Sequence, residues 1–171
     1  MAVMEILKYP NPILKKRCQE VDRIDDGLKK LIQDMTETMY QANGVGLAAC
    51  QVGVLQRVIV IDVSPLDPKQ GLLTLVNPEI VSEEGEIERE EGCLSVPDCW
   101  EKVKRKEKLR VRGVSPEGKE VAVTGEGILA ISLQHEIDHL NGVLILDRLS
   151  RLKREIYRDK LRKEKRKERG D

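Results

Sequence analysis

Apolar residues recur at helical spacing between residues 25 and 44. The stripe consists of Leu28, Leu31, Ile32, Met35 and Met39. Residues three and four positions apart share one face of an α-helix, and Asp25 or Asp26 can cap its first turn. The stripe ends at Asn43-Gly44, a pair typical of a turn. We therefore expect an amphipathic helix whose apolar face packs into the core.

Shorter apolar runs follow. Residues 57–63 and 72–77 are separated by a segment with prolines and glycine, so they predict two buried strands. Residues 108–114 alternate between apolar and polar side chains, and residues 116–119 supply a turn into a further run at 120–123, which predicts a hairpin. Because these strands follow one another without a regular strand–helix repeat, we expect an α+β fold with mainly antiparallel sheets.

The chain's only two histidines, His135 and His139, stand four residues apart in the segment 130–140. In a helix, residues i and i+4 lie on one face, so both imidazoles can reach a single cation. Glu136 would then lie beside the metal, where a carboxylate can take a proton from water and return it to a leaving group. We therefore predict a metal-binding helix here, although the spacing alone names no substrate.

A catalytic metal site needs a third protein ligand and an open position. The remaining candidates are cysteines and carboxylates, since no other histidine exists. Glu155, Glu164 and Glu168 follow the motif, but they belong to a charge-rich tail typical of a solvated helix. Cys93 is favoured, because Gly92 permits a sharp turn before it and we expect it to lie outside strand and helix interiors.

Small residues are concentrated at 44–53, where they allow the backbone to approach another group closely. The segment has neither the glycine spacing nor the lysine of a phosphate-binding loop. Two interpretations remain from the pattern alone, a tight turn or one wall of a substrate site.

The length of 171 residues fits one domain, and its core must be built without Phe. Lys and Arg balance Asp and Glu overall, but residues 148–171 hold 12 basic against 5 acidic residues. The local charge is therefore +7 there and −7 in the remainder. We expect a body at residues 1–147 followed by a basic helical tail at residues 148–171.

The tail offers four apolar residues for contact with the body: Leu149, Leu152, Ile156 and Leu161. They predict a helix with one apolar edge that frays at its end. One interpretation is a solvated helix stabilised by the pairs Arg151–Glu155 and Lys160–Glu164. The other is docking onto a polyanion, because the excess positive charge exceeds what such pairs can neutralise.

No apolar run approaches the roughly 20 residues that span a bilayer, and the first seven residues lack a basic start and a long apolar stretch. We therefore expect a cytoplasmic protein. In that compartment its four cysteines are expected to be thiols or metal ligands, not disulfides.

Three segments together resemble the signature motifs of the peptide deformylase family, in the family's order and spacing: residues 44–51, 91–95 and 134–140. The resemblance implies antiparallel sheets around a central metal-binding helix, and makes residues 1–147 a catalytic metallohydrolase domain. It also implies removal of the formyl group from formyl-methionine of nascent polypeptides, with release of formate. The implied cofactor is one divalent metal ion, usually Fe(II) in cells, with Zn(II), Ni(II) or Co(II) able to replace it in purified protein.

Matching positions imply roles for individual residues. The metal ligands would be Cys93, His135 and His139. Glu136 would be the general base and acid, while Gln51 and the backbone N–H of Leu94 would face the formyl oxygen. Gly46 would hold the substrate backbone as an added strand. The methionine pocket would be lined in part by Val45, Ile128, Ile131 and Ser132.

The sequence departs from the family pattern at two positions. Cys50 stands where many relatives have Pro or Thr, and Trp100 replaces a residue that is Arg in some relatives and holds substrate there. The resemblance also implies that the C-terminal helix contacts the ribosome near the nascent-chain exit. Two other functions remain, a peptidase using the same helix and an RNA- or ribosome-binding protein whose structural metal has a fourth ligand from Cys99 or Cys50.

Overall fold

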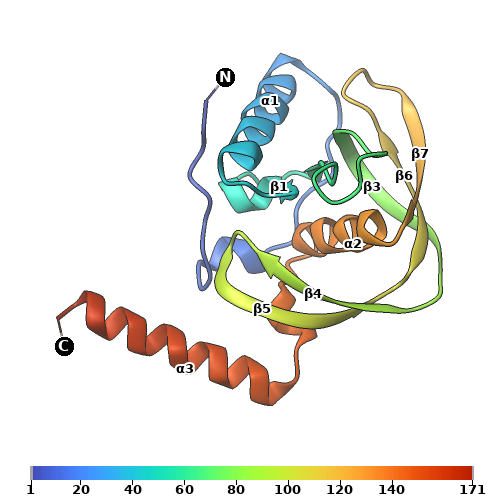
Figure 1. Ribbon diagram of the computed structural model, residues 1–171. Coiled ribbons are helices and arrows are strands. Elements are labelled where there is room, and N and C mark those ends of the chain that lie inside the picture. Colours follow the sequence, from blue (N-terminus) through green and yellow to red (C-terminus); the bar gives the residue numbers. More distant parts are fainter. Residues whose placement is uncertain (1, 171) are drawn as a thin grey trace.

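The computed structural model describes residues 2–170 and confirms an α+β fold. Its helices are α1 (Asp26–Gln41), α2 (Ile128–Leu140) and α3 (Arg151–Glu168), with short 3₁₀ helices η1 (Pro12–Lys15), η2 (Ala49–Val52) and η3 (Ile145–Arg148). Its strands are β1 (Gly46–Ala48), β2 (Val58–Ile61), β3 (Leu73–Glu84), β4 (Ile87–Cys93), β5 (Val96–Arg105), β6 (Lys108–Val114) and β7 (Glu120–Glu126). Figure 1 shows α2 in the middle of the molecule, with the larger sheet curving along one side and the β4–β5 hairpin along another.

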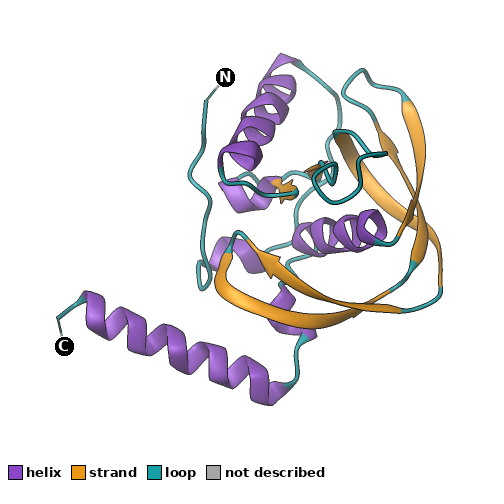
Figure 2. Cartoon of the chain, viewed as in Figure 1, coloured by secondary structure: helices purple, strands orange, loops and turns teal. Residues whose placement is uncertain are grey.

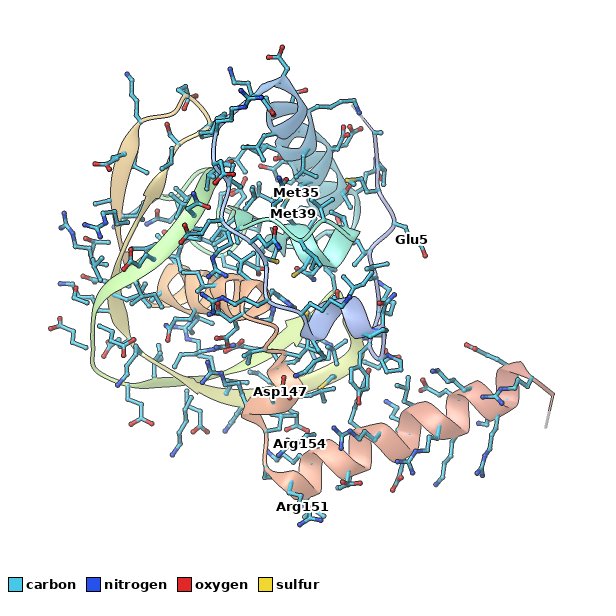
Figure 3. All side chains as sticks on the ribbon, turned by 180° about the vertical axis from the view of Figure 1, so that it is seen from behind. Glu5, Met35, Met39, Asp147, Arg151 and Arg154 are labelled. Atoms are coloured by element: carbon cyan, nitrogen blue, oxygen red, sulfur yellow. The ribbon has the colours of Figure 1, made fainter. Side chains whose placement is uncertain are left out.

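Helix α1 confirms the first predicted amphipathic segment. The Asp25 side chain accepts a hydrogen bond from the backbone N–H of Leu28, which satisfies one of the free donors in the first turn. Met35 and Met39 are fully buried on its inner side (Figure 3). They pack with residues of β1 and β2, so α1 closes one end of the core.

The larger sheet is antiparallel throughout, with strand order β1-β2-β3-β6-β7. The predicted hairpin is present as β6 and β7, which pair from Lys108–Glu126 to Val114–Glu120. Strand β3 extends to Glu84, beyond the predicted run, because its second half pairs with β6 although its side chains are mostly exposed. Strand β1 is one edge of this sheet, and it leads directly into η2.

The sequence pattern did not predict the hairpin formed by β4 and β5 (Figure 2). Its strands are rich in Glu, Lys and Arg, so they lack the aliphatic run of a buried strand. Cys93, which was expected outside strand and helix interiors, is the last residue of β4 and pairs with Val96 across the turn.

Helix α2 is predominantly buried. Leu129, Leu133, Ile137 and Leu140 pack against β1, β2, β3 and β6 in one core cluster. The opposite side of the helix, which carries the histidines, faces the end of the β4–β5 hairpin. Because the apolar side of α2 is packed in the core, the side that carries the histidines is held in a defined position.

Helix α3 extends from the body (Figure 1), and its predicted apolar edge was partly wrong. Leu149 is buried and Leu161 packs against the body, but Leu152 and Ile156 are 71% and 58% exposed. The buried residue is Tyr157, whose hydroxyl donates a 2.8 Å hydrogen bond to the Pro97 carbonyl. Successive helical residues point about 100° apart, so burial of Tyr157 directs Ile156 to solvent.

The ion pairs within α3 also differ from the expected ones. They join Arg158 to Glu155 and Arg162 to Asp159, three residues apart in each case. Between residues 2 and 170, none of the helices combines the length and apolar character needed to cross a membrane.

Candidate active site

The last turns of α2 bring the two histidines together as their spacing predicts. The rings of His135 and His139 lie 5.0 Å apart between centroids. His139 is almost completely buried, and its Nδ1 has no hydrogen-bond partner. Its Nε2 lies 3.3 Å from the sulfur of Cys93, so both atoms face the same point.

Cys93 completes a group of three ligand atoms. Its Sγ and one nitrogen from each histidine all lie within 4.8 Å of one another. The strand β4 carries the cysteine over the end of α2, which joins residues more than 40 positions apart in the sequence. In the described part of the chain, neither Cys50 nor Cys99 belongs to this group.

The ring of His135 is held by a chain of charged groups that the sequence analysis missed. Its Nδ1 lies 3.1 Å from Glu91, and Arg105 donates two hydrogen bonds of 2.9 and 2.8 Å to the same carboxylate. Arg105 also donates a 2.6 Å bond to Asp138, which accepts two more from Arg148. The sequence motifs contained two of these groups, because Glu91 begins the motif at 91–95 and Asp138 lies between the histidines in the motif at 134–140. Such partners orient ligating histidines.

The buried charges perturb these groups in opposite directions. Burial disfavours charge on His135, but Glu136, Cys93 and Glu91 outweigh burial and hold its pKa well above the usual value. Burial, together with the charge on His135, holds the pKa of His139 well below its usual value. The Glu91 carboxyl is also buried, yet Arg105 and His135 lower its pKa. The site therefore favours one positive charge between its acidic groups.

These features fit a metal ion. The three donors are a thiolate sulfur and two imidazole nitrogens, a set that suits Zn, Fe and other first-row transition metals. His135 uses Nδ1 for Glu91, which leaves Nε2 for a metal, and His139 turns Nε2 toward Cys93. Both rings are thus oriented for ligation.

Glu136 lies beside the ligand group with one carboxylate oxygen, Oε1, buried and without a hydrogen-bond partner. Burial raises its pKa to about 7, although His135 and Arg105 oppose the shift. A Cβ atom built on Gly46 would come within 2.4 Å of Oε2 of Glu136. The absence of a side chain at Gly46 therefore leaves the space that the Glu136 carboxylate occupies. This agrees with the expectation that the small residues at 44–53 allow the backbone to approach another group closely.

Gln51 and Leu94 approach the same space from two elements. The Gln51 side chain accepts from the N–H of Ala48 and donates a 2.9 Å bond to Ser95 Oγ. A primary amide carries two hydrogens, and the Gln51 nitrogen also lies 3.8 Å from Cys93 Sγ. Its second hydrogen therefore faces the metal-ligand group. Leu94 follows Cys93 directly in the turn between β4 and β5.

A cavity of about 410 Å³ joins these residues. Every predicted site residue except the buried His139 lines it, including Val45, Ile128, Ile131 and Ser132. A hollow of about 690 Å³ between α1 and the start of β3 contains none of them. The smaller cavity is therefore the functional candidate, and the segment 44–51 forms one of its walls.

The model of the polypeptide deformylase family matches residues 3–155. The chain belongs to the polypeptide deformylase family. A peptide deformylase of Thermodesulfovibrio yellowstonii is 53% identical over 165 residues, covering 96% of this chain and all of the relative. The crystal structure of a peptide deformylase from Legionella pneumophila is similar with a TM-score of 0.90, 49% identity and 99% of each chain covered. That of Ehrlichia chaffeensis peptide deformylase in complex with actinonin has a TM-score of 0.91 and 37% identity, covering 97% of this chain and 99% of the other.

The activity is accordingly that of a deformylase, a metal-dependent amide hydrolase. Its Cys-His-His group is the metal-ligand set typical of the family. This assignment favours deformylation over the peptidase and the structural-metal protein considered from the sequence. A closed structural site would need a fourth ligand, and the group found among residues 2–170 has three.

The structure also places Cys50 and Trp100, the two positions for which the resemblance implied a departure from the family pattern. The thiol of Cys50 is completely buried and donates a 3.3 Å hydrogen bond to the carbonyl of His139, so it supports α2 from below the site. Trp100 is 67% exposed at the rim of the cavity. Its ring lies against Gly92, where a Cβ atom would be only 2.7 Å from the indole.

Proposed function

We propose that this deformylase acts on N-formyl-methionyl ends of nascent peptides. Cys93, His135 and His139 would hold one divalent metal ion, with Glu136 as the general base and acid. The observation that carries the proposal is the convergence of three ligand atoms within 4.8 Å beside a buried carboxylate oxygen that has no partner. Cys93, His135 and Glu136 line a cavity of about 410 Å³, large enough to admit the end of a peptide chain.

The metal, when bound, supplies Lewis acidity that polarises the formyl carbonyl and lowers the pKa of a water molecule toward neutrality. Glu136 accepts the proton that this water gives up as its oxygen attacks the formyl carbon. Burial of the Glu136 carboxyl raises its pKa, which favours a group that accepts the proton and later returns it. Glu136 then delivers the proton to the amine nitrogen, and formate leaves.

Negative charge develops on the formyl oxygen during the attack. The second hydrogen of the Gln51 amide, which points toward Cys93 Sγ in this structure, and the N–H of Leu94 would donate to that oxygen. Gln51 is fixed in advance because Ala48 and Ser95 hold both ends of its amide group. Donors positioned in this way each contribute on the order of 3 kcal/mol to stabilisation of a transition state.

The rest of the substrate would occupy the cavity in two ways. Strand β1 is a sheet edge, so backbone groups near Gly46 can pair with an extended peptide, which tolerates many side chains. Val45, Ile128, Ile131 and Ser132 line the adjoining wall and would contact the methionine side chain. An apolar, flexible side chain suits that lining.

Fe(II) is the proposed metal in cells, while Zn(II), Ni(II) or Co(II) would fit the same ligands in purified protein. An Fe(II) form should lose activity in air faster than a Zn(II) or Ni(II) form, because oxygen can oxidise ferrous iron and the thiolate of Cys93. Equal half-lives of the three forms in air would contradict an iron-centred loss.

The proposed reaction is tested by formate release from a formyl-Met-Ala-Ser peptide with anaerobically purified protein. One formate per new free amine is expected, with no cleavage of the same peptide lacking the formyl group. Cleavage of internal bonds in unformylated peptides would instead indicate a peptidase.

We also propose that α3 carries the enzyme to the ribosome in the cytoplasm. Its exposed residues after Leu161 are almost all charged, with a basic excess that suits ribosomal RNA. Truncation should follow Leu161, because Tyr157 and Leu161 pack against the body. The shortened protein should turn over a short formyl-Met peptide as before but co-sediment less with ribosomes. Ribosome binding that survives both truncation and high salt would contradict the proposal.

A further inference from the structure

The N-terminal segment Leu7–Tyr9 touches both candidate donors to the formyl oxygen. The N–H of Leu7 donates a 2.7 Å bond to the Gln51 carbonyl, and that of Tyr9 donates a 2.7 Å bond to the Ser95 carbonyl. Between them, Lys8 extends its ammonium group to the carbonyl of Leu94 at 2.8 Å. Three successive residues thus hold η2 and the β4–β5 turn from outside the cavity.

The β4–β5 turn needs this external support. Cys93 pairs with Val96, so Leu94 and Ser95 form a two-residue connection between the strands. Such tight connections favour residues with positive φ, usually Gly, Asn or Asp, because these match the twist of the strands. Neither Leu94 nor Ser95 has a positive φ, and a register irregularity precedes the turn between Glu91 and Cys93. The local sequence therefore does not fix the turn by itself.

Three polar groups of the turn have external partners: the hydroxyl and carbonyl of Ser95 and the carbonyl of Leu94. Ser95 is completely buried, and its hydroxyl accepts from Gln51 while its carbonyl accepts from Tyr9. The Leu94 carbonyl is bound by the Lys8 side chain, which is the only side-chain donor to it among the described residues. The Leu94 carbonyl and the Leu94 N–H belong to successive peptide planes that meet at the Leu94 Cα. A bond to the carbonyl therefore limits rotation about ψ of Leu94 and helps to hold in place the residue whose N–H would face the formyl oxygen.

We propose that Lys8 is a positioning residue for deformylation, which holds the Leu94 N–H in the direction of the substrate oxygen. The inference rests on the donor role of Leu94 proposed above. Lys8 itself is exposed and does not line the cavity, so it acts through the Leu94 carbonyl and not on the substrate. Because solvent weakens an exposed hydrogen bond, its effect should be moderate and should appear in the transition state more than in substrate binding.

The test compares Lys8→Met, Lys8→Arg and the control Lys30→Met in the metal-loaded full chain. Lys30 is also an exposed lysine with one ion pair, to Asp34 at 3.0 Å, but it lies on α1 away from the cavity. Lys8→Met should lower kcat by about three- to tenfold with KM and metal content unchanged, well below the roughly 10²–10³-fold loss that follows removal of an oxyanion donor. Lys8→Arg should restore most of kcat, and Lys30→Met should match the wild type.

Amide signals in ¹⁵N NMR spectra of the Zn(II) form give a second readout. The Leu94 and Ser95 amides should shift in Lys8→Met and stay in place in Lys30→Met. A wild-type kcat in Lys8→Met with unmoved amide signals would overturn the inference. Equal losses in Lys8→Met and Lys8→Arg, or a rise in KM without a fall in kcat, would also overturn it. Failure of the wild type to release formate would instead refute the proposed reaction itself.

Discussion

Helices α2 and α3 have opposite relations to the rest of the molecule. Ten of the thirteen residues of α2 are buried, whereas α3 buries one of eighteen. In α2 burial raises the pKa of Glu136 to about 7, and the acidic groups around His135 hold the pKa of that imidazole well above its usual value. In α3 the charged side chains stay in solvent, where each interaction is weak. A functional carboxylate thus depends on the position of its helix more than on its residue type.

The largest contrast is expected between two carboxylates. Glu136→Gln should lower kcat by about 10²- to 10⁴-fold or more, because the variant cannot carry the proton, while metal content is retained. Glu155→Gln on α3 removes an exposed partner of Arg158 and should leave kcat unchanged. Formate release and metal analysis of both variants measure this difference. Loss of metal from Glu136→Gln would contradict its assignment as proton carrier.

Close packing around α2 predicts the next largest effect. Gly46→Ala would place a methyl group against the Glu136 carboxylate and should lower kcat by about 10- to 100-fold through displacement of that group. The control is Gly71→Ala, since a Cβ atom there meets nothing within 4 Å. Equal activity of Gly46→Ala and Gly71→Ala would show that the space beside Glu136 can widen without loss.

Glu91 and Glu101 lie on the β4–β5 hairpin and allow the same comparison between a buried and a more exposed carboxylate. Glu91→Gln removes the charged partner of His135 and should weaken metal affinity by about 10- to 100-fold. Glu101→Gln loses only a pair with Lys153 of α3, 3.1 Å away, and should retain wild-type affinity. Competition with a metal-sensitive dye gives both constants. An unchanged affinity in Glu91→Gln would mean that Arg105 and the helix hold His135 without it.

The smallest effects are expected within α3. Tyr157→Phe loses the hydrogen bond to Pro97 and should lower the free energy of unfolding by about 1 kcal/mol. Ile156→Ala, one residue earlier, should change it by less than about 0.5 kcal/mol because the side chain is exposed. Chemical denaturation of the metal-loaded protein compares the two. A larger loss of stability for Ile156→Ala than for Tyr157→Phe would contradict this and indicate that the side of α3 with Leu152 and Ile156 packs against the body, as the sequence pattern predicted.

The sequence predicts α2 and its histidines well, because ligand spacing within one helix is a local property. It predicts α1 and the β6–β7 hairpin for the same reason, since their apolar periodicity matches burial on one side. Cys93 is different. The residues around Cys93 made it only the favoured candidate for the third ligand, and the choice needed the resemblance to the family motif. Spacing along the sequence cannot show that the fold brings Cys93 next to histidines more than 40 positions away.

The errors have a common cause. Strands β4 and β5 are stabilised by pairing with each other and by a few buried residues. Because most of their residues are charged or polar, the hydrophobic pattern does not predict them as strands. In α3, the sequence allows either the side with Leu152 and Ile156 or the side with Tyr157 and Leu161 to pack against the body. The hydrogen bond from the Tyr157 hydroxyl to the Pro97 carbonyl joins distant parts of the chain, so the sequence pattern could not predict which side is buried. The contact of Lys8 with Leu94 spans 86 positions and follows from no local pattern.

X-ray absorption at the metal edge of the Zn(II)-loaded protein tests the site on α2 most directly. We expect one sulfur at about 2.3 Å, two imidazole nitrogens and at least one further light atom at an open position. The sulfur should disappear in Cys93→Ser and remain in Cys18→Ser, whose thiol lies in the core outside the ligand group. A second sulfur in the wild type, or a sulfur that persists in Cys93→Ser, would contradict the open Cys-His-His site.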